Sequence, residues 1–278
     1  EELRALGAAR VETISNGCDF EDFAGLEYTR STRLRITHTG SFFGRRSPRP
    51  ILEALAGSDV DAVLRFVGDF RAADRDFAQT LGLGDRLELH PYLPRREVLA
   101  IQKDSEALLL LIPDSGGRGR AVLSAKVFEY LAAERPILAA VPTDGAAADL
   151  IRETGAGTGV APDDVDGLRA ALENLDADYR GGRLNGTPLS PALKERLSRG
   201  VRIRLKGTCP RETIEALWEL MAIHRGDRPV AVEVEMNGGS RHVIVRAEVT
   251  QSIRVRTSEQ FVADVEQLCG PGSVTIHS

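Results

Sequence analysis

Residues 107–112 read Ala-Leu-Leu-Leu-Leu-Ile, and residues 113–117, which follow them, read Pro-Asp-Ser-Gly-Gly. A continuous apolar run with a turn sequence behind it is typical of a strand covered on both faces, as in a parallel sheet. The strand opens at its carboxyl end into a flexible loop, and in open α/β sheets ligands bind at that end. This stretch predicts an α/β fold and marks one place to look for a site.

Short apolar strands alternate with amphipathic helices on both sides of this stretch, from Gly7 to about Leu175. The alternation predicts a Rossmann-like fold, a mostly parallel sheet with helices on both faces. The expected strands are Val11–Ser15, Leu34–Thr39, Ala62–Val67, Leu87–Leu89, Ala107–Ile112, Ile137–Ala140 and Gly159–Val160. The expected helices are Pro48–Ala56, Arg71–Leu81, Arg95–Lys103, Ser124–Glu134, Ala146–Thr154 and Asp164–Leu175.

The pattern changes towards the end of the chain, where a second unit is expected. After a looser stretch, Pro210 opens a helix to about His224, and residues 226–229 have the composition of a linker. Beyond the linker, strands, a helix capped by Thr257 and Gln260, and a last strand predict a small α+β unit. We therefore expect a Rossmann-like domain over residues 1–227 and a β-rich appendage over residues 228–278, to which the sequence assigns no activity.

Composition excludes several classes of protein. The 278 residues include 36 basic and 41 acidic side chains, and the net charge of −5 argues against bulk nucleic-acid binding. The longest apolar run is Ala107–Ile112, which is too short to span a membrane. Three widely separated cysteines fit reduced thiols rather than disulfides or a zinc site, so we expect a cytoplasmic protein. Peripheral contact with the inner face of the membrane stays open.

The segment around Lys126 is the first that carries chemistry. The helix expected from Ser124 follows a loop that holds Arg118 and Arg120, and a helix start favours a bound phosphate. Lys126 and Glu129 are three residues apart and share a helix face. A lysine near a diphosphate and a carboxylate near ribose hydroxyls would suit a nucleotide. An exposed ion pair on an ordinary helix is the alternative for this segment taken alone.

A second segment follows the strand Leu34–Thr39. Gly40 and Gly44 allow the backbone to approach a ligand, and Arg45 and Arg46 suit phosphate recognition. A solvated basic loop is the alternative. The sequence has no Walker motif and no Gly-x-Gly-x-x-Gly after the first strand, which disfavours P-loop NTPases and dinucleotide-dependent dehydrogenases.

Other motifs are missing from the sequence. The five histidines lie far apart, there is no His-Glu-x-x-His or Cys-x-x-Cys, and Gly-x-Ser-x-Gly is absent. We therefore expect neither a metal site nor a hydrolase nucleophile. His38 precedes the turn at Gly40, where a hydrogen-bonded, half-buried histidine is the expected interpretation.

Four segments, in their order and spacing, resemble the nucleotide-binding C-terminal half of GT-B-fold glycosyltransferases that use nucleotide-diphosphate sugars with retention. Ile14–Asp19 resembles the family's Asn-Gly-Val-Asp segment, and Gly40–Ala54 resembles its glycine, basic-residue and Leu-Leu-x-Ala segment. Lys126–Pro136 resembles its Lys-x-Phe-Glu-Tyr-Leu-Ala-x-x-x-Pro helix. Val67–Asp69 lies between them, and the resemblance covers about residues 1–224.

The resemblance implies a donor site. Arg46 and Lys126 would be the catalytic cations on the donor phosphates, and Glu129 would hold the ribose. The donor-binding set that the resemblance implies is Gly40, Ser41, Arg45, Arg46, Tyr92, Leu93, Arg118, Arg120, Ala121, Ser124, Lys126 and Glu129.

Two positions depart from the family pattern. Ala121 stands where the first glutamate of the Glu-x₇-Glu motif contacts the transferred sugar, and Ser41 stands where a second phosphate cation is expected. Arg45, Arg118 or Arg120 could supply that charge. The base, the sugar and the acceptor stay open.

The implied function is transfer of a hexosyl or related group from a UDP or GDP sugar to a glycan, lipid or small-molecule acceptor. Cations and helix-terminal N–H groups would stabilise the departing phosphate, so no metal or other cofactor is expected. Acceptor binding in this fold belongs to an N-terminal domain, and Glu1–Leu6 reads as the end of a connection to it. We therefore expect a fragment that binds nucleotide without turning over an acceptor.

Two alternatives remain at this point. The first is a catalytically inactive nucleotide-sugar-binding or interaction module, for which Ala121 and Ser41 would be signs of lost activity. The second is a nucleotide-sugar epimerase, which uses a similar fold and needs acid and base carboxylates and histidines near the sugar, where the sequence offers few.

Overall fold

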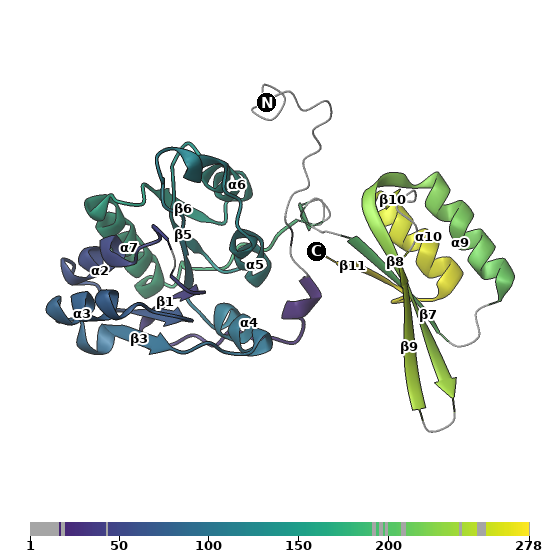
Figure 1. Ribbon diagram of the computed structural model, residues 1–278, viewed down its shortest axis with the longest axis horizontal. Helices are drawn as coiled ribbons and strands as arrows, with labels where there is room; N and C mark the ends of the chain where they lie inside the picture. Colours follow the sequence, from purple (N-terminus) through teal and green to yellow (C-terminus); the bar gives the residue numbers. More distant parts are fainter. Residues whose placement is uncertain are drawn as a thin grey trace.

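The computed structural model describes residues 17, 20–42, 44–190, 193–194, 197, 200–206, 210–238, 241–248 and 254–277. These residues form an α/β unit and a smaller α+β unit (Figure 1). The expected helix end at Glu1–Leu6 and the expected strand Val11–Ser15 lie outside the described residues.

The α/β unit is built on a six-stranded parallel sheet in the order β3-β2-β1-β4-β5-β6. The strands are β1 Leu34–Thr39, β2 Ala62–Val67, β3 Leu87–His90, β4 Ala107–Leu111, β5 Ile137–Ala140 and β6 Gly157–Val160. The order reverses between β1 and β4, which makes this pair the topological switch point of the sheet.

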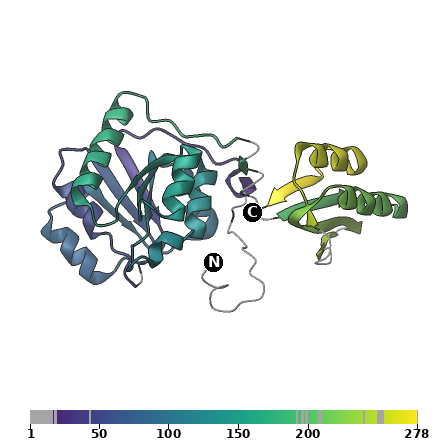
Figure 2. The same cartoon turned by 90° about the horizontal axis from the view of Figure 1, so that it is seen from above.

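Helices cover both faces of this sheet (Figure 2). They are α2 Arg49–Ala56, α3 Ala72–Thr80, α4 Arg95–Lys103, α5 Ala125–Ala133, α6 Ala146–Thr154 and α7 Val165–Arg180, with short 3₁₀ helices η1 Phe20–Phe23, η2 Gly84–Arg86 and η3 Arg118–Ala121. Helices α2, α3 and α7 contribute to the core on one face, and η1, α4, α5 and α6 to the core on the other. The expected Rossmann-like fold is confirmed.

Strand β4 shows why the sequence predicts this architecture. Leu109 and Leu111 belong to one core, and Leu108 and Leu110 to the other, so successive side chains of the strand are buried on opposite faces. A strand covered on both faces needs apolar residues at every position, as residues 107–111 provide.

Helix α7 is longer than expected. It runs from Val165 to Arg180 instead of ending near Leu175, because Tyr179 in its last turn is still buried against the core. Its first turn is capped by Asp164, whose Oδ1 accepts a hydrogen bond of 2.9 Å from the Gly167 N–H.

The α+β unit contains β7 Gly200–Lys206, α9 Arg211–Ile223, β8 Arg225–Gly238, β9 Arg241–Glu248, β10 Arg254–Val255, α10 Glu259–Cys269 and β11 Val274–His277. The sheet order is β10-β8-β7-β11, with β9 paired to β8; β7 and β8 are parallel and the other pairs are antiparallel. Residues from β7, α9, β8, β10 and α10 form a core of their own.

The structure corrects the boundary expected at Asp227. Strand β7 and helix α9 pack in the second unit, which therefore begins at about Gly200. The expected linker, residues 226–229, lies inside strand β8. A Cβ atom at Gly226 would lie 2.5 Å from the Arg256 nitrogen, so this glycine marks a close approach of two backbones rather than a linker.

The cap expected at Thr257 is shifted by one residue. Ser258 is the N-cap of α10, and its Oγ accepts a hydrogen bond of 3.2 Å from the Phe261 N–H. Thr257 is buried, and Gln260 donates to Asp264 instead of closing a capping box.

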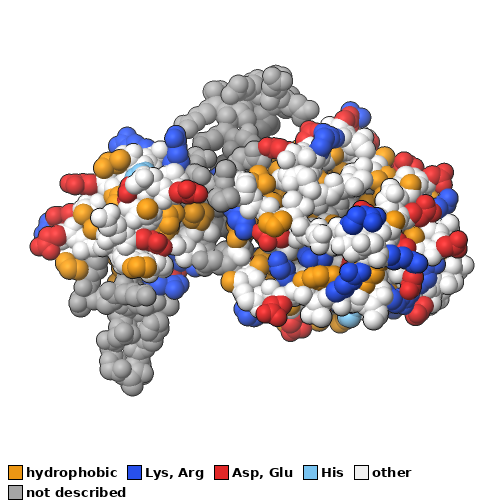
Figure 3. Space-filling view, turned by 180° about the vertical axis from the view of Figure 1, so that it is seen from behind, with side chains coloured by type: hydrophobic (Ala, Val, Ile, Leu, Met, Phe, Trp, Pro, Cys, Tyr) orange, Lys and Arg blue, Asp and Glu red, His pale blue; other side chains and the backbone are white. Residues whose placement is uncertain are grey.

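None of the helices in the described ranges has both the length and the apolar run of a membrane span. On the face shown in Figure 3, Lys and Arg side chains are interspersed with Asp and Glu over both units.

Candidate functional site

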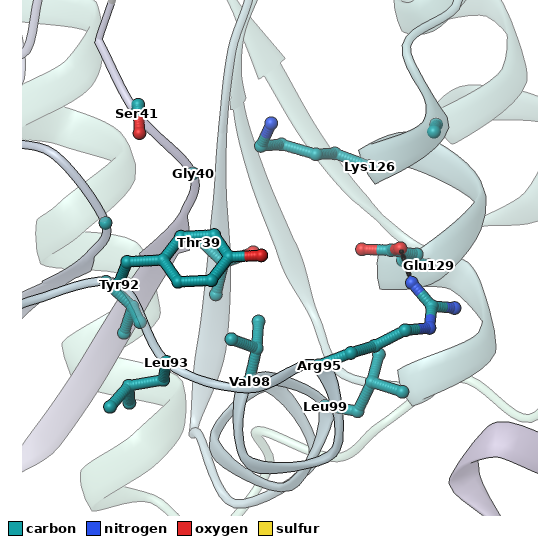
Figure 4. A pocket seen from close by; sticks show the side chains of 13 residues that line it. Thr39, Gly40, Ser41, Tyr92, Leu93, Arg95, Val98, Leu99, Lys126 and Glu129 are labelled. Carbon is teal, nitrogen blue, oxygen red and sulfur yellow. Dashed lines mark hydrogen bonds and ion pairs between the residues drawn. The ribbon is translucent and has the colours of Figure 1, made fainter.

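The main cavity lies at the carboxyl ends of β1, β2 and β3, beside the switch point of the sheet. It has a volume of about 360 Å³. Its lining residues are Thr39, Gly40, Ser41, Val67, Gly68, Tyr92, Leu93, Arg95, Val98, Leu99, Ala125, Lys126 and Glu129 (Figure 4).

Two glycines bring the backbones at the strand ends together. Gly40 has φ +118° and Gly68 has φ +126°, conformations that other residues rarely adopt. A Cβ atom at Gly68 would lie 2.9 Å from the Gly40 carbonyl carbon. The Gly40 N–H donates to the Val67 carbonyl at 2.7 Å, and the Asp69 N–H donates to Ser41 Oγ at 3.1 Å. These contacts fix the floor of the cavity.

Lys126 lies against this floor. A Cβ atom at Gly40 would be 2.5 Å from Lys126 Cε and 2.6 Å from Nζ, so only glycine leaves room for the ammonium group there. Burial lowers the pKa of Lys126, and the charge of Arg46 lowers it further, while Glu129 acts in the opposite direction. The site therefore holds a cation whose surroundings disfavour its charge.

Glu129 projects into the same cavity from the next turn of α5 (Figure 4). Its Oε1 accepts from Arg95 Nη1 at 2.8 Å, and its Oε2 accepts from Gln102 Nε2 at 3.3 Å. Arg95 also pairs with Asp22 at 2.6 Å. The carboxylate side chain is 20% exposed, so it is held in place and still reachable by a ligand.

A buried network supports this carboxylate from behind. Gln102 Nε2 donates to Thr39 Oγ1 at 2.9 Å, and the Thr39 N–H donates to the Tyr130 hydroxyl oxygen at 3.0 Å. Burial raises the pKa of Tyr130 to about 12, so its hydroxyl stays neutral. Residues from β1, α4 and α5 thus form one polar framework.

The opposite wall of the cavity is more apolar. Leu93, Val98 and Leu99 line it, and Tyr92, which is 85% exposed, stands at its edge (Figure 4). An exposed aromatic ring beside aliphatic side chains offers a surface on which a planar group can stack.

A second cavity, which we call the arginine cavity, lies between the loops that follow β1 and β4. Its volume is about 310 Å³. Its lining residues are Gly44, Arg45, Arg46, Ile112, Pro113, Ser115, Arg118, Gly119 and Val122. Burial lowers the pKa of Arg46, so it is a second cation in surroundings that disfavour charge.

The loop that carries Arg46 is held by Arg71, the N-cap residue of α3. Arg71 Nη2 donates to the Arg46 carbonyl at 2.9 Å, and Nη1 donates to the Gly44 carbonyl at 3.4 Å. Arg71 is held in turn by Asp74, at 2.6 Å, which also pairs with Arg49 at 2.9 Å. Asp74 is 2% exposed, and this buried carboxylate fixes Arg71, which holds the loop.

The structure places the expected donor-binding residues in three groups. Gly40, Ser41, Tyr92, Leu93, Lys126 and Glu129 line the main cavity. Arg45, Arg46 and Arg118 line the arginine cavity. Arg120, Ala121 and Ser124 line neither; Arg120 pairs with Asp144 at 3.2 Å, and Ser124 is the N-cap residue of α5.

Sequence reasoning missed Arg95, Thr39 and Gln102. The signal for Arg95 was its place at the start of α4, directly after Tyr92–Pro94. Nothing in the sequence predicts that it reaches Glu129, because the two residues lie on different helices.

Metal-ligand geometry is not found in the part of the chain that the structure describes. No group of three or more His, Cys, Asp or Glu side chains there is placed to hold a metal ion.

Comparisons with known proteins rest on structure. The sequence matches no protein-family profile and no curated protein sequence. Among solved structures, Anabaena HepE in complex with UDP-glucose matches with a TM-score of 0.54 and 16% identity, over 70% of this chain and 56% of that one. Sucrose-phosphate synthase from Thermosynechococcus elongatus matches with a TM-score of 0.50 and 17% identity, over 64% of this chain and 46% of that one.

The α/β unit is a GT-B half-domain by fold. The chain spans about half the length of the solved structures it matches. The GT-B half-domain expected from the resemblance is confirmed as a fold, and at these identities the comparison carries nothing beyond the fold.

Proposed function

We propose that the α/β unit binds a nucleotide-diphosphate sugar and is the donor-binding part of a retaining, metal-independent glycosyltransferase. The observation that carries the proposal is the main cavity itself. Lys126 lines this cavity, and the charge of Arg46 contributes to its lowered pKa. Glu129, whose carboxylate accepts a hydrogen bond from Arg95, lines the same cavity one turn further along α5.

An anion is the natural partner of these cations. Lys126 and Arg46 both have lowered pKa values because they are half-buried, and Arg46 also acts on Lys126 through its charge. A phosphate beside them would offset the lost hydration and the mutual repulsion. The start of α5 borders the same cavity, since Ala125 lines it, and the free backbone N–H groups of a helix start favour a phosphate.

The remaining walls suit the rest of a nucleotide. Glu129 is placed to accept hydrogen bonds from ribose hydroxyls, while Tyr92, Leu93 and Val98 offer a surface for a base. HepE was solved in complexes with UDP-glucose and with UDP. That these ligands belong to a protein of the same fold favours the proposal.

The proposed chemistry uses charge stabilisation. When the bond between sugar and diphosphate breaks, negative charge develops on the departing phosphate. Lys126 and Arg46 would stabilise that charge, and preorganised cations in a partly desolvated site do so strongly. The acceptor, and the residues that bind it, belong to the part of such an enzyme that the α/β unit does not supply.

Titration calorimetry with UDP, GDP and TDP, and with their sugars, tests the proposal. We expect one base to be preferred, and Glu129→Ala to weaken binding of that nucleotide by at least about tenfold, because hydrogen bonds to a charged group are lost. Glu97→Ala, an exposed glutamate on α4 outside both cavities, is the matched control. Absence of binding, or equal affinity in Glu129→Ala, would contradict the proposal.

Assays of sugar transfer and of epimerisation distinguish the glycosyltransferase from an inactive binding module and from an epimerase. A chain that binds nucleotide sugar but belongs to a full-length protein without sugar transfer would be an inactive binding module. Conversion of the bound nucleotide sugar to its epimer would identify an epimerase. We expect the present chain to bind nucleotide without transferring sugar, and measurable transfer by it alone would overturn that expectation.

A further inference from the structure

The arginine cavity has an unusual balance of charge. Arg45, Arg46 and Arg118 line it, from two loops that follow the neighbouring strands β1 and β4. No Asp or Glu is among its lining residues that the structure describes.

The polar side chains that line this cavity are mostly donors. Guanidinium groups only donate, and the Ser115 hydroxyl is the one other polar side chain on the described lining. A neutral sugar presents hydroxyl groups that need acceptors as well as donors. A ligand group that only accepts, and carries negative charge, fits this lining better.

Two carboxylates that contact the loop after β4 are engaged elsewhere. Asp114 Oδ2 accepts from the Gly117 N–H at 3.1 Å inside its own loop. Asp144 pairs with Arg120 outside the cavity. At position 121 the chain has alanine, so the loop contributes no carboxylate there.

Both loops are held in shape. Arg71 fixes the carbonyls of Gly44 and Arg46. In the other loop the Gly119 N–H donates to the Asp114 carbonyl at 2.8 Å, and a Cβ atom at Gly119 would lie 2.1 Å from the Pro113 oxygen. The backbones that carry the arginines are therefore already fixed. A ligand that binds there does not have to spend binding free energy on ordering these loops.

The loop after β1 lines both cavities. Gly40 and Ser41 lie in the main cavity, and Gly44, Arg45 and Arg46 lie in the arginine cavity. The charge of Arg46 also contributes to the lowered pKa of Lys126 in the main cavity. A diphosphate held between these two cations would direct the group attached to it towards Arg45 and Arg118.

We infer that the arginine cavity binds a carboxylate on the sugar, so that the donor is a nucleotide-diphosphate uronic acid. Arg45 and Arg118 are the residues that select it, since a guanidinium group binds a carboxylate through two parallel hydrogen bonds. The inference rests on the proposed function, because the nucleotide must occupy the main cavity for its sugar to reach this one.

The experiment compares UDP, UDP-glucose and UDP-glucuronate by titration calorimetry on the intact chain, with GDP, GDP-mannose and GDP-mannuronate as the corresponding set. We expect the uronate donor to bind at least about tenfold more tightly than the neutral donor of the same base. Arg118→Gln and Arg45→Gln should each reduce this preference, and the double variant should abolish it. Arg75→Gln, an exposed arginine on α3 outside both cavities, should keep it.

The outcomes separate the two proposals. If UDP or GDP binds but the neutral donor binds as tightly as the uronate, or if the preference survives in the double variant, the carboxylate site is wrong and the nucleotide site stands. If none of UDP, GDP and TDP binds, both proposals are overturned.

Discussion

Lys126 is a cation in surroundings that oppose its charge, and this has a measurable consequence. Its pKa lies below the usual 10.5 because of burial and because of Arg46. A bound phosphate would raise that pKa again, so binding takes up a proton wherever free Lys126 is partly neutral. Nucleotide affinity is therefore expected to be greatest where Lys126 is charged and to fall as the pH rises towards 10.5.

Calorimetry with the nucleoside diphosphate of the preferred base, at pH values from about 7.5 to about 10, measures this dependence. In Lys126→Met the affinity should be low throughout, and its alkaline decline should be smaller than in the wild type. Lys194→Met, which removes a lysine paired with Glu134, is the control that should keep the decline. An alkaline decline of equal size in Lys126→Met would contradict this role.

His38 is predicted to make the protein sensitive to acid. It is fully buried, its Nδ1 lies 2.8 Å from the Leu109 carbonyl, and burial lowers its pKa to about 3. The unfolded chain binds the proton near pH 6.5, so the stability due to neutral His38 is present above 6.5 and is lost as the pH falls towards 3. The loss is about 1.4 kcal/mol for each pH unit in that window.

Urea unfolding at pH 7 and at pH 5 tests this prediction against His38→Gln, which does not titrate. The variant should lose less of its free energy of unfolding between the two pH values than the wild type does. His90→Gln, at a side chain 40% exposed, should behave like the wild type. Equal losses in wild type and His38→Gln would show that His38 does not titrate in this way.

Gly40 is expected to tolerate no side chain. Gly40→Ala places a Cβ atom in a left-handed conformation and 2.5 Å from Lys126 Cε, so the ammonium group must move. We expect nucleotide affinity to fall by about tenfold or more and stability to fall by about 1–3 kcal/mol. Gly82→Ala shares the positive φ, +64°, but has nothing within 4 Å, so it should cost stability without affecting affinity.

The sequence predicts which site residues lie close together when they belong to the same helix. The spacing of Lys126 and Glu129 predicts that they share a helix face, and the structure has both residues lining the main cavity. The partners of Glu129 were not predictable, because Arg95 and Gln102 come from α4 and a sequence pattern does not show which side chains meet across helices.

At the scale of elements, the loop between β1 and α2 depends on α3 for its shape. Arg71→Ala removes the hydrogen bonds to the Gly44 and Arg46 carbonyls and leaves the residues that line both cavities unchanged. We expect nucleotide affinity to fall several-fold. The free energy of unfolding should fall by about 1–3 kcal/mol, because buried Asp74 loses one of its two arginine partners. Arg75→Ala on the same helix is the matched control, and equal affinities for the two variants would contradict the positioning role of Arg71.

Most elements of the α/β unit follow from periodicity. Strands β1, β2 and β5 and helices α4 and α6 have the expected bounds, and several other ends differ by one or two residues. Strand β7 was missed, although Val201, Ile203 and Leu205 alternate with charged residues in the sequence. The sequence on either side of β7 has no regular pattern, so the strand was not recognised. Its pairing partners, β8 and β11, lie at least twenty residues away, and a local pattern does not predict such pairing.

At the scale of the molecule, the position of the boundary is testable by truncation. A chain that ends at Asp227 keeps β7 and α9 but loses most of β8 and all of α10, so Ile203, Leu217 and Met221 lose their partners in the second core. We expect this truncation to aggregate, whereas one that ends at Arg199 should not aggregate and should bind nucleotide. Size-exclusion chromatography measures whether each truncated chain aggregates. A soluble 1–227 chain without aggregates would contradict the boundary at about Gly200.

The proposed site holds a nucleoside diphosphate in the main cavity through Lys126. The most direct measurement is a calorimetric comparison of uridine, UMP and UDP on the intact chain, repeated with the guanosine and thymidine series. For the preferred base, affinity should rise from nucleoside to diphosphate, and Lys126→Met should remove most of that rise. Equal affinity for nucleoside and diphosphate, or an undiminished rise in Lys126→Met, would contradict the claim.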